Sequence, residues 1–387
     1  MPRSPLFGRR IHISGSISTD PVVAGADDVD CARRVVVALV EALVRRGATF
    51  VIPVDRENRR ADGKPICFDW LIWETLQANL MHRPHDAPAP LAIAVQHYKS
   101  EDQVPDDKAA LWDSVRTSPL IRIENAAFWN MAAKRMEAQA RFGDVLLTLG
   151  GGEGVLFLAN LYHDAGKPVV PLDLPITGEH GGSRKLFAYG LTSAQSERLF
   201  RTSDQLGAHA WINRVRSTPR QTPEQRAACI VELLEALAPP RAFGVRLLNP
   251  KHAEYEAVED HFETVVRPVL ESELGYELTV IDGRSPFEKA RIDDEIFAKL
   301  HRSGVVIADI TGSRPNCFLE LGYALGRQLP TMVMAREGSD TPFDITTVSG
   351  LHWNASAPLR DRRQAFREHW NAIRNRPPLV PVEPLIA

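Results

Sequence analysis

Short apolar runs alternate along the first 237 residues with longer segments in which apolar residues recur every three or four positions. The short runs have the length of buried strands, and the longer segments have the period of helices with one buried face. An order of strand, helix and strand at the start of a chain predicts a parallel, Rossmann-like sheet. The predicted elements are strand 10–14, helix 31–46, strand 48–53, helix 68–80, strand 91–95, helix 125–142, strand 144–149, helix 155–165, strand 168–172 and helix 222–237.

The same alternation starts again after Pro239 and Pro240, a pair that ends the last of these helices. We therefore predict an α/β protein made of two tandem Rossmann-like domains with parallel sheets. The predicted boundaries are 1–215 for the first domain, 216–240 for a helical linker and 241–387 for the second domain. The second series of elements is strand 242–248, helix 254–273, strand 277–282, helix 287–302, strand 305–308, a helix starting near 316, strand 330–334 and helix 365–374.

Composition narrows the choice of partners. A formal net charge of −3 over 387 residues lacks the basic surplus that is typical of a nucleic-acid-binding protein. No apolar run approaches the roughly 20 residues that cross a membrane, and the N-terminus has no apolar signal-peptide core. The four cysteines form no closely spaced pair, and His252 and His261 have no third ligand near them. We therefore expect a cytoplasmic protein without metal or cofactor and without membrane or nucleic-acid partners.

One stretch of the second series, residues 303–327, combines a buried strand, a polar loop and a helix. Asp309 ends the strand, at the edge where open parallel sheets place their ligand crevices. Asn316, preceded by a proline, is a suitable N-cap for the helix. That cap places Glu320 in the first helical turn, where the helix dipole favours an ionised carboxylate. Asp309 and Glu320 thus form a candidate acid/base or nucleophile pair.

A glycine-rich loop, Gly150–Gly154, stands between a strand and a helix of the first series. Backbone without Cβ atoms lets a phosphate approach closely, and the helix start supplies unpaired N–H donors. Gly15 and Ser16 follow the first strand and are expected at the same edge of the sheet. The loop lacks the Gly-Lys-Ser/Thr ending of a phosphate-binding Walker loop. A tight turn without any ligand is the alternative.

The glycine loop resembles that of the SLOG superfamily, which includes the DNA-processing protein DprA and the Lonely-guy phosphoribohydrolases. These hydrolases carry Pro-Gly-Gly-x-Gly-Thr-x-x-Glu at this place. The glycines match here, whereas Val155 stands for the threonine and Leu158 for the catalytic glutamate. Lys134 and Arg135 resemble the basic pair of the family in reversed order. The resemblance implies a nucleotide-binding sensor without hydrolase chemistry, with a nucleotide-derived ligand held by Gly15, Ser16, Arg135, Gly150, Gly151, Gly152, Glu153 and Gly154.

Residues 241–377 resemble the nucleoside 2-deoxyribosyltransferase-like family, which is distantly related to TIR domains. The most specific match runs from Asp309 to Tyr323, and Thr341–Asp344 is similar to a late loop of these proteins. In that family the glutamate of the Glu-Leu-Gly-Tyr-Ala segment attacks the anomeric carbon of the sugar. The resemblance therefore implies that Glu320 is the nucleophile, Asp309 its acidic partner and Asn316 a sugar contact.

Further residues of this domain are candidate substrate contacts. Asp282 ends another strand and Arg284 follows it, where an arginine suits a substrate phosphate. A surface turn is the alternative for Arg284. Asn249 stands where many relatives have a Pro-Phe turn, so Asn249 or Tyr255 replaces the usual sugar contacts. Tyr323 belongs to the matched motif.

Together these patterns predict that the C-terminal domain cleaves the bond between base and sugar of a nucleotide or NAD, with water as the second substrate. Proteins of this build resemble antiviral effectors that a nucleotide signal switches on, and TIR-like relatives make a homo-oligomer plausible. Two alternatives stay open. The chain is a non-catalytic nucleotide-binding scaffold, or the first domain is a diverged phosphoribohydrolase in which Glu153 or Glu124 replaces the missing acid.

Overall fold

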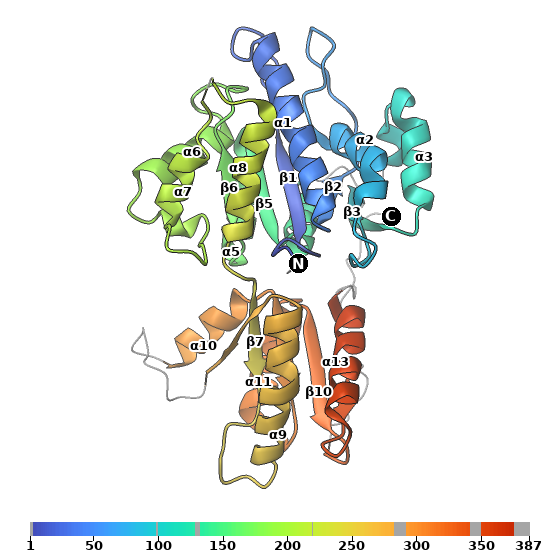
Figure 1. The fold of residues 1–387 in the computed structure, drawn as a ribbon, viewed down its shortest axis with the longest axis vertical. Coiled ribbons are helices and arrows are strands. Elements are labelled where there is room, and N and C mark those ends of the chain that lie inside the picture. The colour runs from blue at the N-terminus through green and yellow to red at the C-terminus, as the bar shows by residue number, and fades with distance from the viewer. Residues whose placement is uncertain are drawn as a thin grey trace. The chain divides into compact units, whose positions relative to one another are not determined.

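The computed structural model describes residues 3–97, 100–127, 132–218, 220–281, 292–340 and 350–374. The chain forms two compact units, Met1–Ala238 and Pro239–Pro381, each built on its own sheet (Figure 1). Asp282, Arg284 and the segment Thr341–Asp344 lie outside the described residues, so their predicted roles stay predictions.

The first unit holds a six-stranded sheet in which every neighbouring pair is parallel. The order β4-β3-β2-β1-β5-β6 reverses direction between β1 and β5, and at such a reversal parallel sheets open a crevice beyond the carboxyl ends of the strands. The predicted parallel, Rossmann-like sheet is confirmed. The strands are β1 (Arg10–Ser16), β2 (Thr49–Pro53), β3 (Ala92–His97), β4 (Ile121–Ala127), β5 (Val145–Gly150) and β6 (Val169–Leu172).

Helices cover this sheet, and their buried faces follow the apolar spacing of the sequence. The predicted helix 125–142 is too long: β4 occupies its first residues, and α4 begins only at Ala132. The alternation of Ile121, Arg122, Ile123 and Glu124 is the strand signal that the prediction missed. The helices are α1 (Ala26–Arg45), α2 (Asp69–Asn79), α3 (Ala109–Thr117), α4 (Ala132–Phe142), α5 (Glu153–Asp164), α6 (Gly182–Thr192), α7 (Ala208–Arg214) and α8 (Pro223–Ala236), with short 3-10 turns at Leu80–His82, Glu101–Gln103, Asp106–Lys108 and Ser196–Arg198.

Helix α8 belongs to the core of the first unit, although the sequence placed it in a linker. Thr222 caps the helix by accepting a hydrogen bond from the Gln225 amide, and the Gln225 side chain accepts one from the Thr222 amide. Ile230, Val231 and Leu234 are buried in the same apolar cluster as α1 and the sheet. The break between the units follows Ala238.

The second unit holds a five-stranded sheet of order β11-β10-β9-β7-β8, again with every neighbouring pair parallel. Its strands are β7 (Arg241–Val245), β8 (Glu277–Val280), β9 (Val305–Asp309), β10 (Thr331–Arg336) and β11 (Leu351–Trp353). The three-residue β11 is too short to leave a periodic signal, and it was not predicted. The helical segments are α9 (Tyr255–His261), which continues as wider π-helical turns at Phe262–Val266 and Pro268–Glu273, and α10 (Ile292–His301), α11 (Pro315–Gly326) and α13 (Leu359–Arg374).

The two faces of this second sheet carry separate apolar cores. Val305 and Ile307 of β9 pack in the cluster that contains Phe262 and Trp370, from the α9 segment and α13. Val306 and Ala308 pack in the other cluster, with residues of α10 and α11. This alternation follows from the two-residue period of a strand. The same alternation determines which acidic side chains can lie on the same face of the sheet.

Candidate active site

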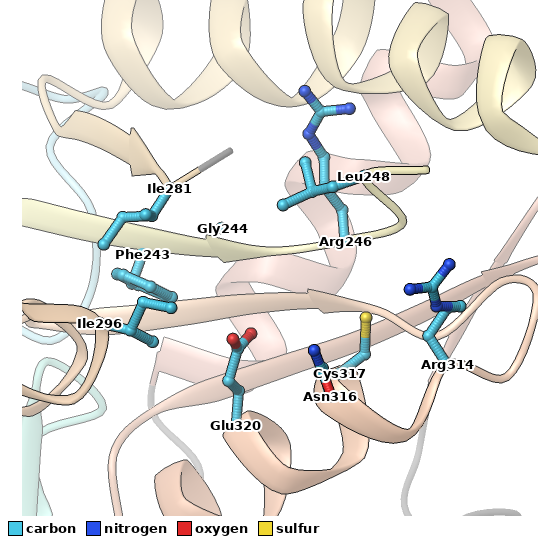
Figure 2. A pocket seen from close by; sticks show the side chains of 10 residues that line it. All are labelled: Phe243, Gly244, Arg246, Leu248, Ile281, Ile296, Arg314, Asn316, Cys317 and Glu320. Carbon is cyan, nitrogen blue, oxygen red and sulfur yellow. The ribbon is translucent and has the colours of Figure 1, made fainter. Parts of the chain in front are cut away.

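A cavity of about 120 Å³ lies in the second unit between β7, α10 and the start of α11 (Figure 2). Pockets that enclose a whole small-molecule ligand usually measure roughly 300–1,000 Å³, so this cavity is small. Figure 2 shows the Glu320 side chain rising from α11 toward β7, with its carboxylate in the cavity. The lining residues are Phe243, Gly244, Arg246, Leu248, Ile281, Ile296, Arg314, Asn316, Cys317 and Glu320.

Glu320 differs from its predicted setting in one respect. Helix α11 begins at Pro315 with Arg314 as the N-cap, so the prediction that Asn316 caps the helix is wrong. Proline suits the first helical position because its fixed φ matches the helix and its missing N–H would have had no partner there. Glu320 consequently falls in the second turn, beyond the strongest influence of the helix dipole.

Burial determines the pKa of the Glu320 carboxyl. Desolvation raises the pKa of this carboxyl from 4.5 to about 7, which is opposite to the predicted preference for the ionised form. Among the residues that the structure describes, the Glu320 carboxylate has no hydrogen bond or ion pair. A carboxyl that is poised near neutrality, unpaired and beside a cavity fits a nucleophile or an acid/base group.

Asp309 lies on the other face of the sheet from the side chains that surround Glu320. Its side chain is fully buried and does not line the cavity. One carboxylate oxygen accepts the backbone N–H of Thr311 at 2.9 Å, and the other accepts Trp353 Nε1 at 2.8 Å. Burial raises the pKa of Asp309 to about 6 although both donors oppose the rise. The structure does not bring Asp309 and Glu320 together in one cavity, and the catalytic role of Asp309 stays a prediction.

The partners of Asp309 are themselves held in place. Trp353 stacks on the buried His261 ring with centroids 4.2 Å apart and planes 7° from parallel. Thr311 Oγ1 accepts the backbone N–H of Arg336 at 2.9 Å. Through these contacts, Asp309 and Thr311 hold the end of β9 and the loop that follows it against β10 and β11. Sequence reasoning missed Trp353 and His261 because only the fold brings them to Asp309.

The remaining predicted substrate contacts divide into two groups. Asn316 lines the cavity, as predicted. Tyr323 and Asn249 do not: the Tyr323 hydroxyl meets His301 Nδ1 at 2.7 Å, and Asn249 Oδ1 accepts the Lys251 N–H at 3.2 Å. Both side chains serve local structure in this conformation.

Cys317 also lines the cavity. Its side chain is buried, and burial raises the pKa of the thiol to about 12. The thiol therefore stays protonated at neutral pH. This matches the interpretation of Cys317 as a small buried residue at a helix start.

Two arginines of the lining had no signal in the sequence. Arg246 is paired with Glu259 and lies over the Phe262 ring, 5.2 Å from its centroid. The guanidinium of Arg314, the N-cap of α11, has no hydrogen bond or ion pair among the described residues. Isolated arginines in a sequence give no hint of a site, so only the cavity identifies these two.

In the first unit, Gly15, Gly150 and Gly151 close the carboxyl ends of β1 and β5 against each other. A Cβ on Gly15 would stand 1.7 Å from the Leu149 carbonyl oxygen, and one on Gly150 would stand 2.3 Å from the Ser16 oxygen. The Gly151 N–H donates to the same Ser16 oxygen at 2.8 Å. Gly15 and Gly150 are required by packing between backbones whether or not a ligand binds.

The outer half of the glycine loop is open. Gly152, Glu153 and Gly154 are exposed, and a Cβ on Gly152 would meet no atom within 4 Å. Gly152 is the N-cap of the 12-residue helix α5, and Glu153 pairs only loosely with Lys185 at 3.5 Å. This end of the loop has the space that an approaching anion needs. The predicted ligand role of the loop stays a prediction.

Arg135 and Leu158 bear on whether this unit is catalytic. Arg135 Nη1 pairs with Asp55 Oδ2 at 2.5 Å, beyond the end of β2. Leu158 is 1% exposed in a purely apolar cluster. Of the two candidate replacements for the missing acid, Glu124 is paired with Arg122, and the Glu153 side chain is 87% exposed. A phosphoribohydrolase site in the first unit gains no support from this geometry.

Within the described parts of the chain, no three His, Cys, Asp or Glu side chains are placed to hold a metal ion. The same parts contain no helix with the length and apolar content that crossing a bilayer demands.

The chain was compared with known proteins and structures. No curated protein matches it. The X-ray structure of TM1055, a structural genomics target, is 15% identical with a TM-score of 0.25 and covers 46% of this chain and 81% of its own. A conserved protein from Enterococcus faecalis V583 is 12% identical with a TM-score of 0.22 and covers 34% of this chain and 99% of its own. These scores are too low to support an argument.

The family described as ATP nucleosidase Cap17-like, N-terminal, matches residues 6–234. The match spans the whole first sheet and nearly all of α8, which agrees with α8 being part of the first unit. Because the matched residues make up more than half of the sequence, the chain belongs to the Cap17-like ATP nucleosidase family, by way of its N-terminal domain.

Proposed function

We propose that this protein hydrolyses the N-glycosidic bond of a nucleotide, with Glu320 of the second unit as the reacting group. The observation that carries the proposal is the half-buried Glu320 carboxyl, which lies in a cavity without a partner among the described residues and has its pKa raised to about 7. The family name supports ATP as the first substrate to test. NAD is a second substrate, because it contains the same type of bond between a base and a ribose.

The chemistry requires one carboxylate and one water. An ionised Glu320 oxygen attacks the anomeric carbon while the bond from that carbon to the base nitrogen breaks, and the base keeps the electron pair and takes a proton from solvent. Water then adds to the anomeric carbon and releases the Glu320 carboxylate, giving up one proton. The net reaction consumes one water and yields a free base and a ribose phosphate. Asn316, which lines the same cavity, binds a sugar hydroxyl in this proposal.

The first unit acts in this proposal as the sensor of a nucleotide-derived signal, which binds at the open half of the glycine loop around Gly152 and switches on the second unit in an antiviral response. The exposed helix start at Gly152 supports this role. The buried Leu158 supports placing the reaction elsewhere.

The test is base release by the full-length protein. The protein is incubated with ATP, other nucleotides and NAD, with and without candidate nucleotide signals, and free base is measured by chromatography. We expect release by the wild type and a loss of roughly 10²- to 10⁴-fold in Glu320→Gln. Glu256→Gln is the matched control, because Glu256 is exposed on α9. Equal rates in wild type and Glu320→Gln, or none in either with every signal present, would exclude the proposal.

A non-catalytic nucleotide-binding scaffold is the competing function. The cavity of about 120 Å³ favours it in one respect, since a complete nucleotide exceeds that volume. The two functions separate in the same assay: a scaffold binds ATP but releases no adenine.

A further inference from the structure

The cavity beside Glu320 has an apolar end and a cationic end. Figure 2 shows Phe243, Ile281 and Ile296 on one side of Glu320, and Arg314 on the other side. An apolar wall suits the face of a nucleobase, and a guanidinium suits a phosphate group. The polarity of the lining therefore predicts the orientation of a bound nucleotide, with its base at the apolar end and its phosphate at the cationic end.

Arg314 is the available cation at this end. Arg246, the other arginine of the lining, is about nine-tenths buried and is already neutralised by its ion pair with Glu259. The Arg314 side chain has neither a hydrogen bond nor an ion pair within the described residues. An anion that enters the cavity thus meets one guanidinium that does not have to leave an existing partner first.

The spacing along α11 fits a phosphorylated sugar. Arg314 is the N-cap and Glu320 the sixth residue of the helix, so they are separated by about 9 Å along the helix axis. Asn316 lies between them in the lining (Figure 2). The positive end of the helix dipole adds a favourable field at the Arg314 end. The anomeric carbon and the phosphate chain of a nucleotide are separated in the same sense, with the sugar hydroxyls between them.

We propose that Arg314 binds the phosphate chain of the substrate and makes the site selective for nucleotides over nucleosides. In this assignment the sugar occupies the cavity with its anomeric carbon facing Glu320, the base extends toward Phe243, Ile281 and Ile296, and the phosphate chain extends past Arg314 beyond the cavity. This assignment rests on the proposed function for the identity of the reacting group, but phosphate binding by Arg314 does not require any reaction.

Binding to Glu320→Gln tests the assignment without turnover. Isothermal titration compares ATP, AMP and adenosine on Glu320→Gln alone and on Glu320→Gln combined with Arg314→Gln, Arg314→Lys or Arg302→Gln. Arg302 is the control, because it is an exposed arginine of the same unit outside the cavity. We expect Arg314→Gln to weaken ATP and AMP binding by roughly 10- to 100-fold, to leave adenosine unchanged and to be partly restored by Arg314→Lys.

Two outcomes would overturn the assignment: ATP binding that is unchanged by Arg314→Gln, or a loss of adenosine binding equal to that of ATP. Failure of the proposed function looks different. If the wild type releases no base while ATP binding depends on Arg314, hydrolysis is excluded and phosphate recognition stands. If the wild type releases base from adenosine and ATP equally well and Glu320 is required, hydrolysis stands and the role of Arg314 is lost. Thermal unfolding of each variant establishes that it is folded.

Discussion

At the scale of single residues, burial decides how the two acids of the 303–327 stretch behave. Both Asp309 and Glu320 have raised pKa values because both are desolvated. Asp309 has two donors on its oxygens, whereas Glu320 has no partner among the described residues. The same chemical group therefore anchors a loop at one position and is available for reaction at the other.

The raised pKa of Glu320 predicts a pH dependence. A nucleophilic carboxylate must be ionised, so kcat/KM for base release should rise as pH increases through about 7 and then level off. Initial rates from pH 5 to 9 with substrate below KM check this, after stability has been verified across the range. A rate that falls through the same window would assign Glu320 as a general acid and not as the nucleophile.

The same residue predicts a gain of stability on mutation. Glu320 has a pKa of about 7 in the folded protein against roughly 4.3 when unfolded, so folding disfavours its ionised form. The contribution of Glu320 to the free energy of unfolding is therefore fully present below about pH 4.3 and is lost as the pH rises to about 7. Glu320→Gln, which cannot ionise, should therefore become more stable relative to wild type between pH 5 and pH 8. Denaturation midpoints at both pH values measure the difference, and a constant difference contradicts it.

At the scale of elements, the strand-to-helix connections hold both candidate sites. The β9–α11 connection is fixed through Asp309, and the β5–α5 connection is fixed by glycines that touch the end of β1. The periodic pattern located these strands, but β4 was missed: the alternation at residues 121–124 was not recognised, and the predicted helix was extended backward over residues 125–127, the end of that strand. The spacing of apolar residues assigns an element as helix or strand well only where a helical and a strand-like period do not adjoin.

Asp309→Asn tests the anchoring of β9. An amide offers one acceptor oxygen, so either the Thr311 N–H or Trp353 Nε1 would face an NH₂ group inside the core. We expect unit 2 to lose about 1–3 kcal/mol of unfolding free energy. Chemical denaturation at pH 7.5 measures the loss, with the exposed Asp340→Asn as control. A loss of activity at unchanged stability would instead indicate the direct catalytic role.

Gly15, in β1, and Gly152, in the glycine loop, provide two contrasting positions for a substitution to alanine. Gly15→Ala places a methyl group 1.7 Å from the Leu149 oxygen, and overpacking of this kind should cost at least about 1–3 kcal/mol. Gly152→Ala meets no atom within 4 Å and should change stability by less than about 1 kcal/mol. Thermal unfolding measures both. If Gly152→Ala weakens nucleotide binding to the first unit while stability is kept, the sensor role gains support; equal destabilisation by both variants contradicts the packing argument.

At the scale of the whole molecule, the chain contains two units with separate cores. The apolar cluster that ends at Leu237 shares no residue with the clusters that begin at Ala242. The strands of each unit pair only with other strands of the same unit. Folding therefore does not require either core to be completed by the other.

Separate cores predict separate stability. The fragment 1–238 should fold alone and unfold cooperatively, and in the full chain Asp309→Asn should shift only the unfolding transition of residues 239–387. Differential scanning calorimetry of the full chain, the fragment and the variant checks this. A single transition that Asp309→Asn shifts as a whole would show that the units unfold together.

The sequence by itself determined the alternation of strands and helices, the two parallel sheets and the position of Glu320 on the helix after β9. These features follow from local periodicity and from the rule that parallel strands end at one edge. Only the tertiary structure decided that Asp309 faces Trp353 while Glu320 faces a cavity, and that the Arg314 side chain beside it has no partner among the described residues. Burial, charge pairing and the resulting pKa values depend on residues distant in the chain, so no local pattern contains them.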